Sequence, residues 1–583
     1  MYGLNINLQL IYIGLFIISI EAQEVNLTST NLPIIVIDTY GEIIPDEPKI
    51  SAHMGIIFNI SGEINYITDP FNHYDGYIGI EIRGHSSQNF PKKQYGLETR
   101  NSEGENLNVS LFGIPKENDW VLYAPYSDKS LMRNVLAYDI ARSLGSYAPR
   151  TQFCEVILNN DYVGIYVFME KIKKDSNRVN IYDPEPDNLS GGYLLEVNTL
   201  TKIDSTDNYF ESASQGSFFV IKFPEKDDIT VDQIAWIKNY INTFESTLYS
   251  GSFNDPDIGY YQYIDSPSWV DYILLNEAFR NNDVFYSSTY LHKKKNGKLV
   301  AGPVWDFNIA MGNIDYNDNW LTEGSLLASK YLSSILLEDS SFVSAYQVRW
   351  NTLRNNQLTI STINSLIDYY VELLGTAQER NFERWPILGS DVWPNYYIGI
   401  TYEDEVNYLK QWITDRFIWM DSQLLLEDID GCIGQLDKCE VCEGNGYADW
   451  ECNDGGTTCW DKADGTCDCD GNIDDCSGIC GGDDASCLSI EELIIPDNYS
   501  ISSIYPNPFN PVTNITYGLP EHVNVQIIVY DLSGKQIETL INQFQTPGYH
   551  SVNWDADDLP SGVYLIRMDS GDFTQTQKVM LVK

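Results

Sequence analysis

The segment at residues 429–487 is the feature that most limits how this chain of 583 residues can fold. It consists mainly of Asp, Gly and Cys, as in CDCDGNIDDCSGICGGDDASC, with almost no aliphatic residues. Such a segment cannot build an apolar core, so disulfides or bound cations must hold it. Ten of the eleven cysteines lie between Cys432 and Cys487, a density typical of disulfide scaffolds in oxidising compartments. We therefore predict a stiff disulfide-bonded spacer that separates two domains, and Ca²⁺ binding to it stays open.

The N-terminus carries an apolar stretch that ends in IEAQ. Its length is too short for a comfortable membrane span and fits a signal peptide at 1–22, cut after Ala22. No Lys or Arg precedes the apolar stretch, which departs from the usual pattern. No later stretch is long and apolar enough to span a membrane. We expect an exported mature chain with no integral membrane segment.

The charge balance restricts the partners. The chain has 36 Lys and Arg against 83 Asp and Glu, a net charge of -47. Nucleic acids and anionic membranes both require a positive face, so neither is expected as a general partner. The acidity is typical of a soluble extracellular protein, and it is also compatible with binding of Ca²⁺ or Mg²⁺.

Residues 23–428 have the composition of one large globular domain, with a β segment at its start. Strand patterns come first, as in LPIIVID, GYIGIEIRG and GGYLLEVN. CEVILNNDYVGIYVF reads as a hairpin that turns at residues 159–161, and Cys154 within it reads as an inert buried thiol. Helical spacing follows in DQIAWIKNYINTFESTL, WVDYILLNEAF and INSLIDYYVELLGTA. This order predicts an α+β fold.

The last part of the chain returns to β patterning. After a short linker at 488–500, residues 501–583 alternate apolar and polar residues around Ser-Gly turns, as in NVQIIVYDLSGKQIETL. This pattern predicts a small C-terminal β-sandwich, and it contains no evident catalytic groups.

The stretch LVAGPVWDFNIAMGN places Asp306 directly after an apolar strand, where an unpaired carboxylate would be costly. Asn296-Gly297 is typical of a two-residue hairpin turn, so the arms on either side should return Asp283 and Asp306 to the same place. Two carboxylates that converge repel each other unless a cation lies between them, and Mg²⁺ with substrate phosphates is a natural solution. The alternative is that Asp306 caps a turn and Asp283 is solvated.

The order of these residues is similar to the layout of protein kinases. There a catalytic Asp is followed five positions later by a metal-binding residue, then by a hairpin and a metal-binding Asp. Here the order is Asp283, Ser288, the hairpin, and Asp306 in Asp-Phe-Asn. Asn308 completes that last motif.

Upstream, a polar Gly-Ser loop lies beside Arg83, Lys92 and Lys93. Such a loop can offer backbone N–H groups and a lysine to phosphates, although an ordinary surface loop would look the same. Glu170 closes an apolar strand and could orient the phosphate-binding lysine, or it could simply be exposed.

Several motifs in order resemble the CotH kinase family, the spore-coat-protein-H type of atypical secreted kinase. They are RGHSSQNFPKKQYGLETR, DWVLYAPYSDKSLMRNVLAYDIA, YVGIYVFMEKIKKDSNRVNI, GGYLLEVN and GPVWDFNIAMGN, within about residues 50–425. The resemblance implies an atypical protein-kinase-like fold that binds ATP with Mg²⁺ or Mn²⁺ and phosphorylates Ser on exported proteins. It implies that Asp283 is catalytic, that Asp306 binds metal, that Lys92 or Lys93 contacts phosphate, and that Glu170 pairs with that lysine.

Two positions depart from residues common in that family. Ser288 stands where many members have Asn, and Asn308 stands where many have Asp. Both can bind Mg²⁺ through oxygen, but they supply less charge. The role of Arg133 and Asn134 in KSLMRN stays open between contact with substrate and a purely structural one at the start of a helix.

The tail resembles the type A C-terminal sorting domain of the type IX secretion system. The resemblance rests on IYPNPFNPVTNITYGL, VYDLSGKQIETL, LPSGVYLIRM and the terminal KVMLVK. It implies a Gram-negative source, recognition by the type IX secretion machinery, and a final place at the cell surface or outside the cell.

Other classes of function stay open beside the kinase. A catalytically weak or inactive CotH-like surface protein could bind Ca²⁺, glycan or matrix partners, and the spacer and tail suit it equally well. A zinc or serine hydrolase is disfavoured, because the six histidines show no zinc-ligand spacing and no G-x-S-x-G motif is present. A glycosidase that uses a carboxylate pair is a further alternative.

Overall fold

The computed structural model describes residues 25–424, except 60–62, 183–188 and 215, and residues 499–582, except 506, 508, 510, 521–522, 532–534, 546–547, 557–558 and 571–572. These residues form two compact units, one with residues 25–109 and 117–424 and one with residues 110–116 and 499–582. The predicted signal peptide, the Cys-rich spacer with its disulfides and Ca²⁺, and most of the linker lie outside the described residues.

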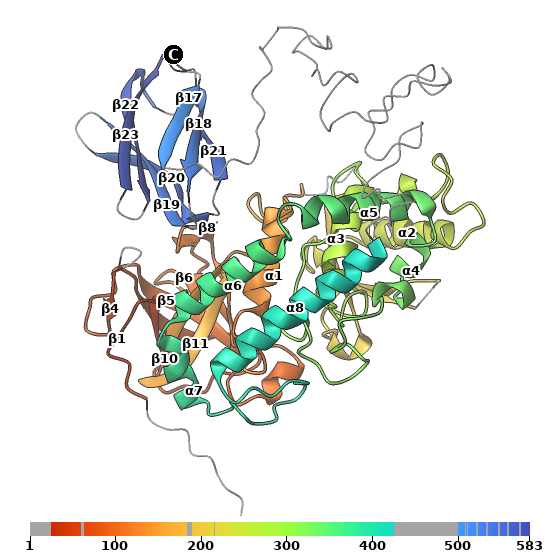
Figure 1. The fold of residues 1–583 in the computed structure, drawn as a ribbon, viewed down its shortest axis with the longest axis horizontal. Helices are drawn as coiled ribbons and strands as arrows, with labels where there is room; N and C mark the ends of the chain where they lie inside the picture. Colours follow the sequence, from red (N-terminus) through yellow and green to blue (C-terminus); the bar gives the residue numbers. More distant parts are fainter. Residues whose placement is uncertain are drawn as a thin grey trace, which may run out of the picture. The chain divides into compact units, whose positions relative to one another are not determined.

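The first unit begins with a closed seven-stranded barrel (Figure 1). In ring order the strands are β10 (Thr151–Leu158), β11 (Asp161–Glu170), β9 (Asp119–Tyr123), β6 (Gln94–Arg100), β5 (Tyr74–Arg83), β3 (Ile50–Ile57) and β2 (Ile34–Asp38). Parallel pairing of β2 with β10 closes the ring, so no edge of the sheet stays unpaired. A two-stranded sheet joins β1 (Ser29–Thr30) to β4 (Asn65–Tyr66), and another joins β7 (Val109–Leu111) to β8 (Ile114–Glu117), whose residues 110–116 are counted with the second unit.

The hairpin predicted from CEVILNNDYVGIYVF is confirmed as β10 and β11, which pair antiparallel from Thr151 with Met169 to Leu158 with Asp161. Asn159 and Asn160 form the turn with φ values of 51° and 67°. Left-handed conformations at both central residues match the twist of the strands, and Asn tolerates them better than most residues. Cys154 is a free thiol buried in β10, as predicted.

A second sheet carries the hairpin on which the candidate site depends. Its order is β13 (Tyr209–Glu211), β14 (Phe218–Phe223), β12 (Tyr193–Asn198), β15 (Thr289–Lys293) and β16 (Leu299–Ala301). The hairpin of β15 and β16 is confirmed, but its loop is longer than the two-residue turn predicted, because the last pair is Lys293 with Leu299. Ser190 holds this loop: its hydroxyl accepts from the Asn296 N–H, and its carbonyl accepts from Lys293 Nζ.

Except for the first helix, which lies between β9 and β10 along the chain, the helices follow the barrel. They are α1 (Arg133–Ser143), α2 (Val231–Leu248), α3 (Ser266–Ala278), α4 (Ser333–Leu336), α5 (Ser340–Arg354), α6 (Ile360–Leu374), α7 (Ala377–Arg384) and α8 (Tyr402–Leu424), with short 3₁₀ turns at Ser86–Asn89, Leu200–Lys202, Tyr260–Gln262 and Leu327–Ser329. The three predicted helices are confirmed as α2, α3 and α6, and a capping box of Thr230 and Gln233 begins α2. Helix α7 packs on β11, and α8 packs against α3, α5 and α6 (Figure 1).

One core joins α1, the helices and the inner faces of both sheets. It includes the fully buried side chains of Trp269, Trp350 and Tyr138. The mixture of sheets and helices confirms the α+β class. Among the described helices, none has the length and the apolar composition to cross a lipid bilayer.

The second unit is made of antiparallel strands, as predicted for the tail. One sheet has the order β17 (Ser500–Tyr505), β18 (Val512–Leu519), β21 (Gly548–Asp555), and the other has the order β20 (Gln536–Gln545), β19 (Val523–Asp531), β22 (Gly562–Ser570), β23 (Phe573–Leu581). Buried residues of both sheets, such as Ile515, Trp554 and Ile566, form one core cluster.

Candidate active site

The two aspartates selected from the sequence lie near one another. Asp283 is in the turn after α3, and Asp306 follows β16 once Gly302-Pro303 has ended the strand. Burial and then the charge of Asp283 raise the pKa of Asp306 from 3.8 to about 6. The two carboxyls therefore lie close enough for their charges to interact, which suits them to share a cation.

Hydrogen bonds orient the side chain of Asp283. Asn282 Nδ2 donates to one carboxylate oxygen at 3.0 Å, and the Ser287 hydroxyl donates to the other at 3.5 Å. Lys330 Nζ donates to the Asn282 carbonyl at 2.8 Å, which brings a positive charge near Asp283. Asp283 is half-buried, so its carboxylate keeps access to a ligand.

Asp306 stands on an unusual backbone. Its φ is 62°, a left-handed value that costs free energy for a residue with a side chain. The Asp306 N–H donates to the Tyr138 hydroxyl at 3.1 Å, and the Phe307 N–H donates to Asn134 Oδ1 at 2.6 Å. Both acceptors come from α1.

Two cations lie near the aspartates, one beside the second sheet and one at the end of a barrel strand. Lys202, at the end of the 3₁₀ turn after β12, donates to the Ser287 hydroxyl at 2.9 Å. The positive charges of Lys202 and Arg83 act to lower the pKa of Asp306, but burial and the charge of Asp283 raise it by more. Arg83 ends β5, and its guanidinium carbon lies 5.6 Å from the ring centre of Trp305, next to Asp306.

A lysine–glutamate pair of the second sheet lies beside these groups. Lys222 on β14 is 3.8 Å from Glu196 on β12. Burial raises the pKa of Glu196, while Lys222, Arg83 and Lys202 act to lower it. The electrostatic coupling places Glu196 among the same cations that act on Asp306.

The sequence did not single out Lys202, Lys222 or Glu196. For Glu196 and Lys222 the available signal was a charged residue in an apolar strand, as in YLLEVN and FFVIKF, whereas Lys202 lies in a 3₁₀ turn without that signal. A charge there needs a partner or a function, because burying it alone is costly.

The basic loop selected from the sequence is only partly at this site. Arg83 is there, but Lys92 is 2% exposed and donates to the Ile165 carbonyl at 2.6 Å and to Asn381 Oδ1 at 2.8 Å. Burial lowers the pKa of Lys92 to about 7. Lys93 donates back to the Gln88 carbonyl within its own loop. Lys92 therefore lies between β11 and α7, among groups that already satisfy its ammonium.

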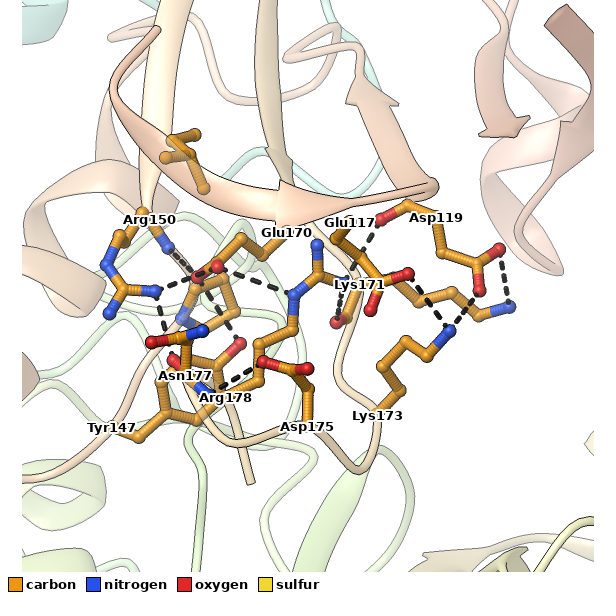
Figure 2. A network of polar contacts seen from close by, with 12 residues as sticks. Glu117, Asp119, Tyr147, Arg150, Glu170, Lys171, Lys173, Asp175, Asn177 and Arg178 are labelled. Atoms are coloured by element: carbon orange, nitrogen blue, oxygen red, sulfur yellow. Dashed lines mark hydrogen bonds and ion pairs between the residues drawn. The ribbon is translucent and has the colours of Figure 1, made fainter. Parts of the chain in front are cut away.

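Glu170 is bonded to arginines rather than to Lys92 or Lys93. Its carboxylate lies 2.8 Å from Arg150 Nη1 and 3.4 Å from Arg178 Nε, and Figure 2 shows it between the two. Further along the same network, Lys173 contacts Asp119 at 2.8 Å. Glu170 is fully buried, so this pairing satisfies a charge that could not otherwise lie inside the protein.

Ser288 and Asn308 are close to the aspartates in sequence, but the described bonds use their neighbours or their backbone. Ser287, not Ser288, bonds the carboxylate of Asp283. The Asn308 carbonyl accepts from Asn313 Nδ2 at 2.7 Å. Ser288 has a left-handed φ of 54°, which ends the turn before β15.

The donor set fits Mg²⁺ bound together with phosphates better than a cage made of protein alone. Within residues 25–424 and 499–582, apart from the gaps given above, no three His, Cys, Asp or Glu side chains are grouped to hold a metal. Mg²⁺ commonly takes one or two carboxylates, with waters and substrate phosphates completing its shell. Asp283 and Asp306, whose mutual repulsion a cation would relieve, supply that share.

A cavity of about 330 Å³ lies elsewhere, between α1, α3 and β16. Its lining includes Leu144, Tyr272 and His292 but neither aspartate. We therefore assign the candidate site from the charged groups and not from this cavity.

Comparisons with known proteins agree with this geometry. Residues 80–420 match the family described as CotH kinase protein, and residues 503–583 match the secretion system C-terminal sorting domain. The chain is 31% identical over 99 residues to inner spore coat protein H of Bacillus subtilis (strain 168). The aligned stretch covers 16% of this chain and 24% of that protein. The match thus spans about a quarter of that relative's length.

The sorting domain indicates type IX secretion and a place outside the cell or at its surface. The family match extends over more than half of the sequence and includes both aspartates, and so the chain belongs to the CotH kinase family.

Proposed function

We propose that this protein transfers the γ-phosphate of ATP to serine residues of exported proteins, with Mg²⁺ or Mn²⁺ held at Asp306 beside the catalytic Asp283. The observation that carries the proposal is that Asp306 lies close enough to Asp283 for their charges to interact, with Lys202 and Arg83 near the same carboxylate. Two carboxylates with cations near them are complementary to a metal-bound triphosphate.

The residues divide the work of phosphoryl transfer. Asp283 accepts the proton of the substrate serine hydroxyl while the serine oxygen bonds to the γ-phosphorus. The bond from that phosphorus to the bridging oxygen breaks, and ADP leaves. Arg83, Lys202 and Lys222 stabilise the negative charge of the phosphates, and Glu196 orients Lys222. A divalent cation held by Asp306 would neutralise phosphate charge during the transfer.

This chain differs from residues common in the family at two candidate metal-binding positions, Ser288 and Asn308. Ser288 and Asn308 carry no charge, so they would contribute neutral oxygen ligands. Asp283 and Asp306 are both present, and for this reason we propose an active kinase in preference to a surface protein that binds Ca²⁺, glycan or matrix.

Transfer of labelled γ-phosphate to the protein itself or to a serine-rich acceptor tests the proposal. With Mg²⁺ or Mn²⁺ we expect labelling by the wild type and none by Asp306→Asn. Asp368→Asn is the matched control, since Asp368 lies on α6 with its side chain 63% exposed. Equal labelling by wild type and Asp306→Asn would indicate a contaminating kinase. No labelling with either metal would refute the proposal and leave the binding function.

A further inference from the structure

Helix α1 carries two side chains that hold the backbone at Asp306. Asn134 and Tyr138 are four residues apart, so they lie on the same face of the helix. Tyr138 accepts from the Asp306 N–H at 3.1 Å, and Asn134 accepts from the next N–H, that of Phe307, at 2.6 Å. Two consecutive amides are thus bound by one helix face.

The two acceptors are themselves firmly placed. Tyr138 is 0% exposed and stacks on Trp305 with ring centres 6.0 Å apart and planes 19° apart. Asn134 is 3% exposed. The start of α1 is fixed by a buried ion pair in which Arg133 Nη1 lies 2.6 Å from Asp128. A helix held in this way is a rigid support for the segment that it contacts.

The bonds have a specific purpose because Asp306 is left-handed. A residue with a side chain usually leaves a φ of 62° unless neighbouring groups determine it. A return to negative φ would change the direction in which the Asp306 side chain leaves the backbone. It would also leave the buried Phe307 N–H without an acceptor, which costs free energy.

We propose that Asn134 and Tyr138 are positioning residues that hold Asp306 in its left-handed conformation, so that its carboxylate faces Asp283. This inference rests on the proposed function, since the purpose of the arrangement is to bind the divalent cation with nucleotide. It also assigns a role to the KSLMRN motif: its Asn contacts the metal-binding segment rather than the substrate.

Tyr138→Phe is the sharpest test, because it removes the accepting oxygen and keeps the ring that stacks on Trp305. Tyr370→Phe is the matched control, since Tyr370 is buried on α6 and its hydroxyl bonds Asp139 of the same helix α1. Both variants lose one part-buried hydroxyl bond to or from α1, and the control should lose at least as much thermal stability because its bond is to a carboxylate. Only the first changes the support of Asp306.

The readout is the Mn²⁺ concentration that gives half of the thermal stabilisation by ATP. We expect Tyr138→Phe to raise it about five- to tenfold, the effect of one lost hydrogen bond, and Tyr370→Phe to leave it unchanged. Excess Mn²⁺ should restore full stabilisation. Hydrogen exchange at residues 305–309 should become faster in Tyr138→Phe but not in Tyr370→Phe. Asn134→Ala should behave as Tyr138→Phe does.

The outcomes separate this inference from the proposed function. If the wild type is stabilised by Mn²⁺ with ATP, but Tyr138→Phe and Asn134→Ala need no more Mn²⁺ than the wild type, the positioning role is wrong and the kinase stands. If the wild type is not stabilised at all, the proposed function fails, and the positioning role fails with it.

Discussion

Two groups of lysines and glutamates in this protein look alike in sequence but have different environments. In the barrel, Lys92 is enclosed by the Ile165 carbonyl and Asn381, and Glu170 is enclosed by Arg150 and Arg178. In the second sheet, Lys222 and Glu196 are 3.8 Å apart, and the side chain of Lys222 is 36% exposed. A charge whose partners are all provided by the fold supports the fold, whereas a loosely paired charge beside two carboxylates is available to a ligand.

The largest expected effect is on catalysis at the second sheet. Lys222→Met or Lys202→Met should lower kcat/KM for ATP by roughly a hundredfold, because each removes a charge that stabilises phosphate in a partly enclosed site. Lys226→Met, an exposed position just beyond β14, is the control and should keep full activity. Steady-state kinetics with labelled ATP measures the difference. A loss of the same size in Lys92→Met would reverse the comparison between the two regions.

The next effect is on stability in the barrel. Glu170→Gln should lower the free energy of unfolding by about 3 kcal/mol, because it leaves buried arginine charge without its partner. The fraction that stays folded should bind ATP with Mn²⁺ as the wild type does. Urea unfolding and nucleotide titration check the two parts, with the exposed Glu372→Gln as control. Loss of nucleotide affinity without loss of stability would place Glu170 at the active site after all.

Asp306→Asn should stabilise the metal-free protein while it removes activity. The folded protein raises the pKa of this carboxyl from 3.8 to about 6, so the folded state binds the proton more tightly than the unfolded state does. The ionised carboxylate therefore lowers stability fully above about pH 6 and not at all below about pH 3.8. Removing the charge should add up to about 3 kcal/mol at pH 7.5.

The same variant should gain much less at pH 4 than at pH 7.5. A gain that is independent of pH would come from the left-handed backbone, which Asn tolerates better than Asp, and would argue against repulsion from Asp283. Urea unfolding with a metal chelator at the two pH values separates these contributions.

The smallest effect is expected for Lys92→Met at neutral pH. The variant loses two hydrogen bonds, at about 1 kcal/mol each, but it also removes the cost of burying an amine whose folded pKa is about 7. The folded state binds this proton less tightly than the unfolded state, so the wild type gains stability between about pH 7 and pH 10.5. Lys92→Met should lack that gain. Unfolding curves at pH 7 and pH 9.5 test this, and equal pH dependence in both proteins would contradict it.

Local patterns in the sequence were sufficient for several elements of the first unit. Alternating apolar residues around Asn159 and Asn160 gave the hairpin of β10 and β11, and helical spacing gave α2, α3 and α6. The hairpin of β15 and β16 was also predictable, and with it the approach of Asp283 and Asp306. Its longer loop was not, because Ser190, far away in sequence, holds that loop.

The sequence by itself determined several strands, the helices α2, α3 and α6, and the approach of the aspartate pair, because these depend on residues that are close along the chain or joined by one hairpin. Only the tertiary structure decided which cations face that pair. Lys92 has its partner Asn381 289 positions away, and Lys202 reaches Ser287 across 85 positions. The surroundings of a charged side chain are set by whichever distant segments pack around it, and these surroundings decide whether the charge supports the fold or meets a ligand.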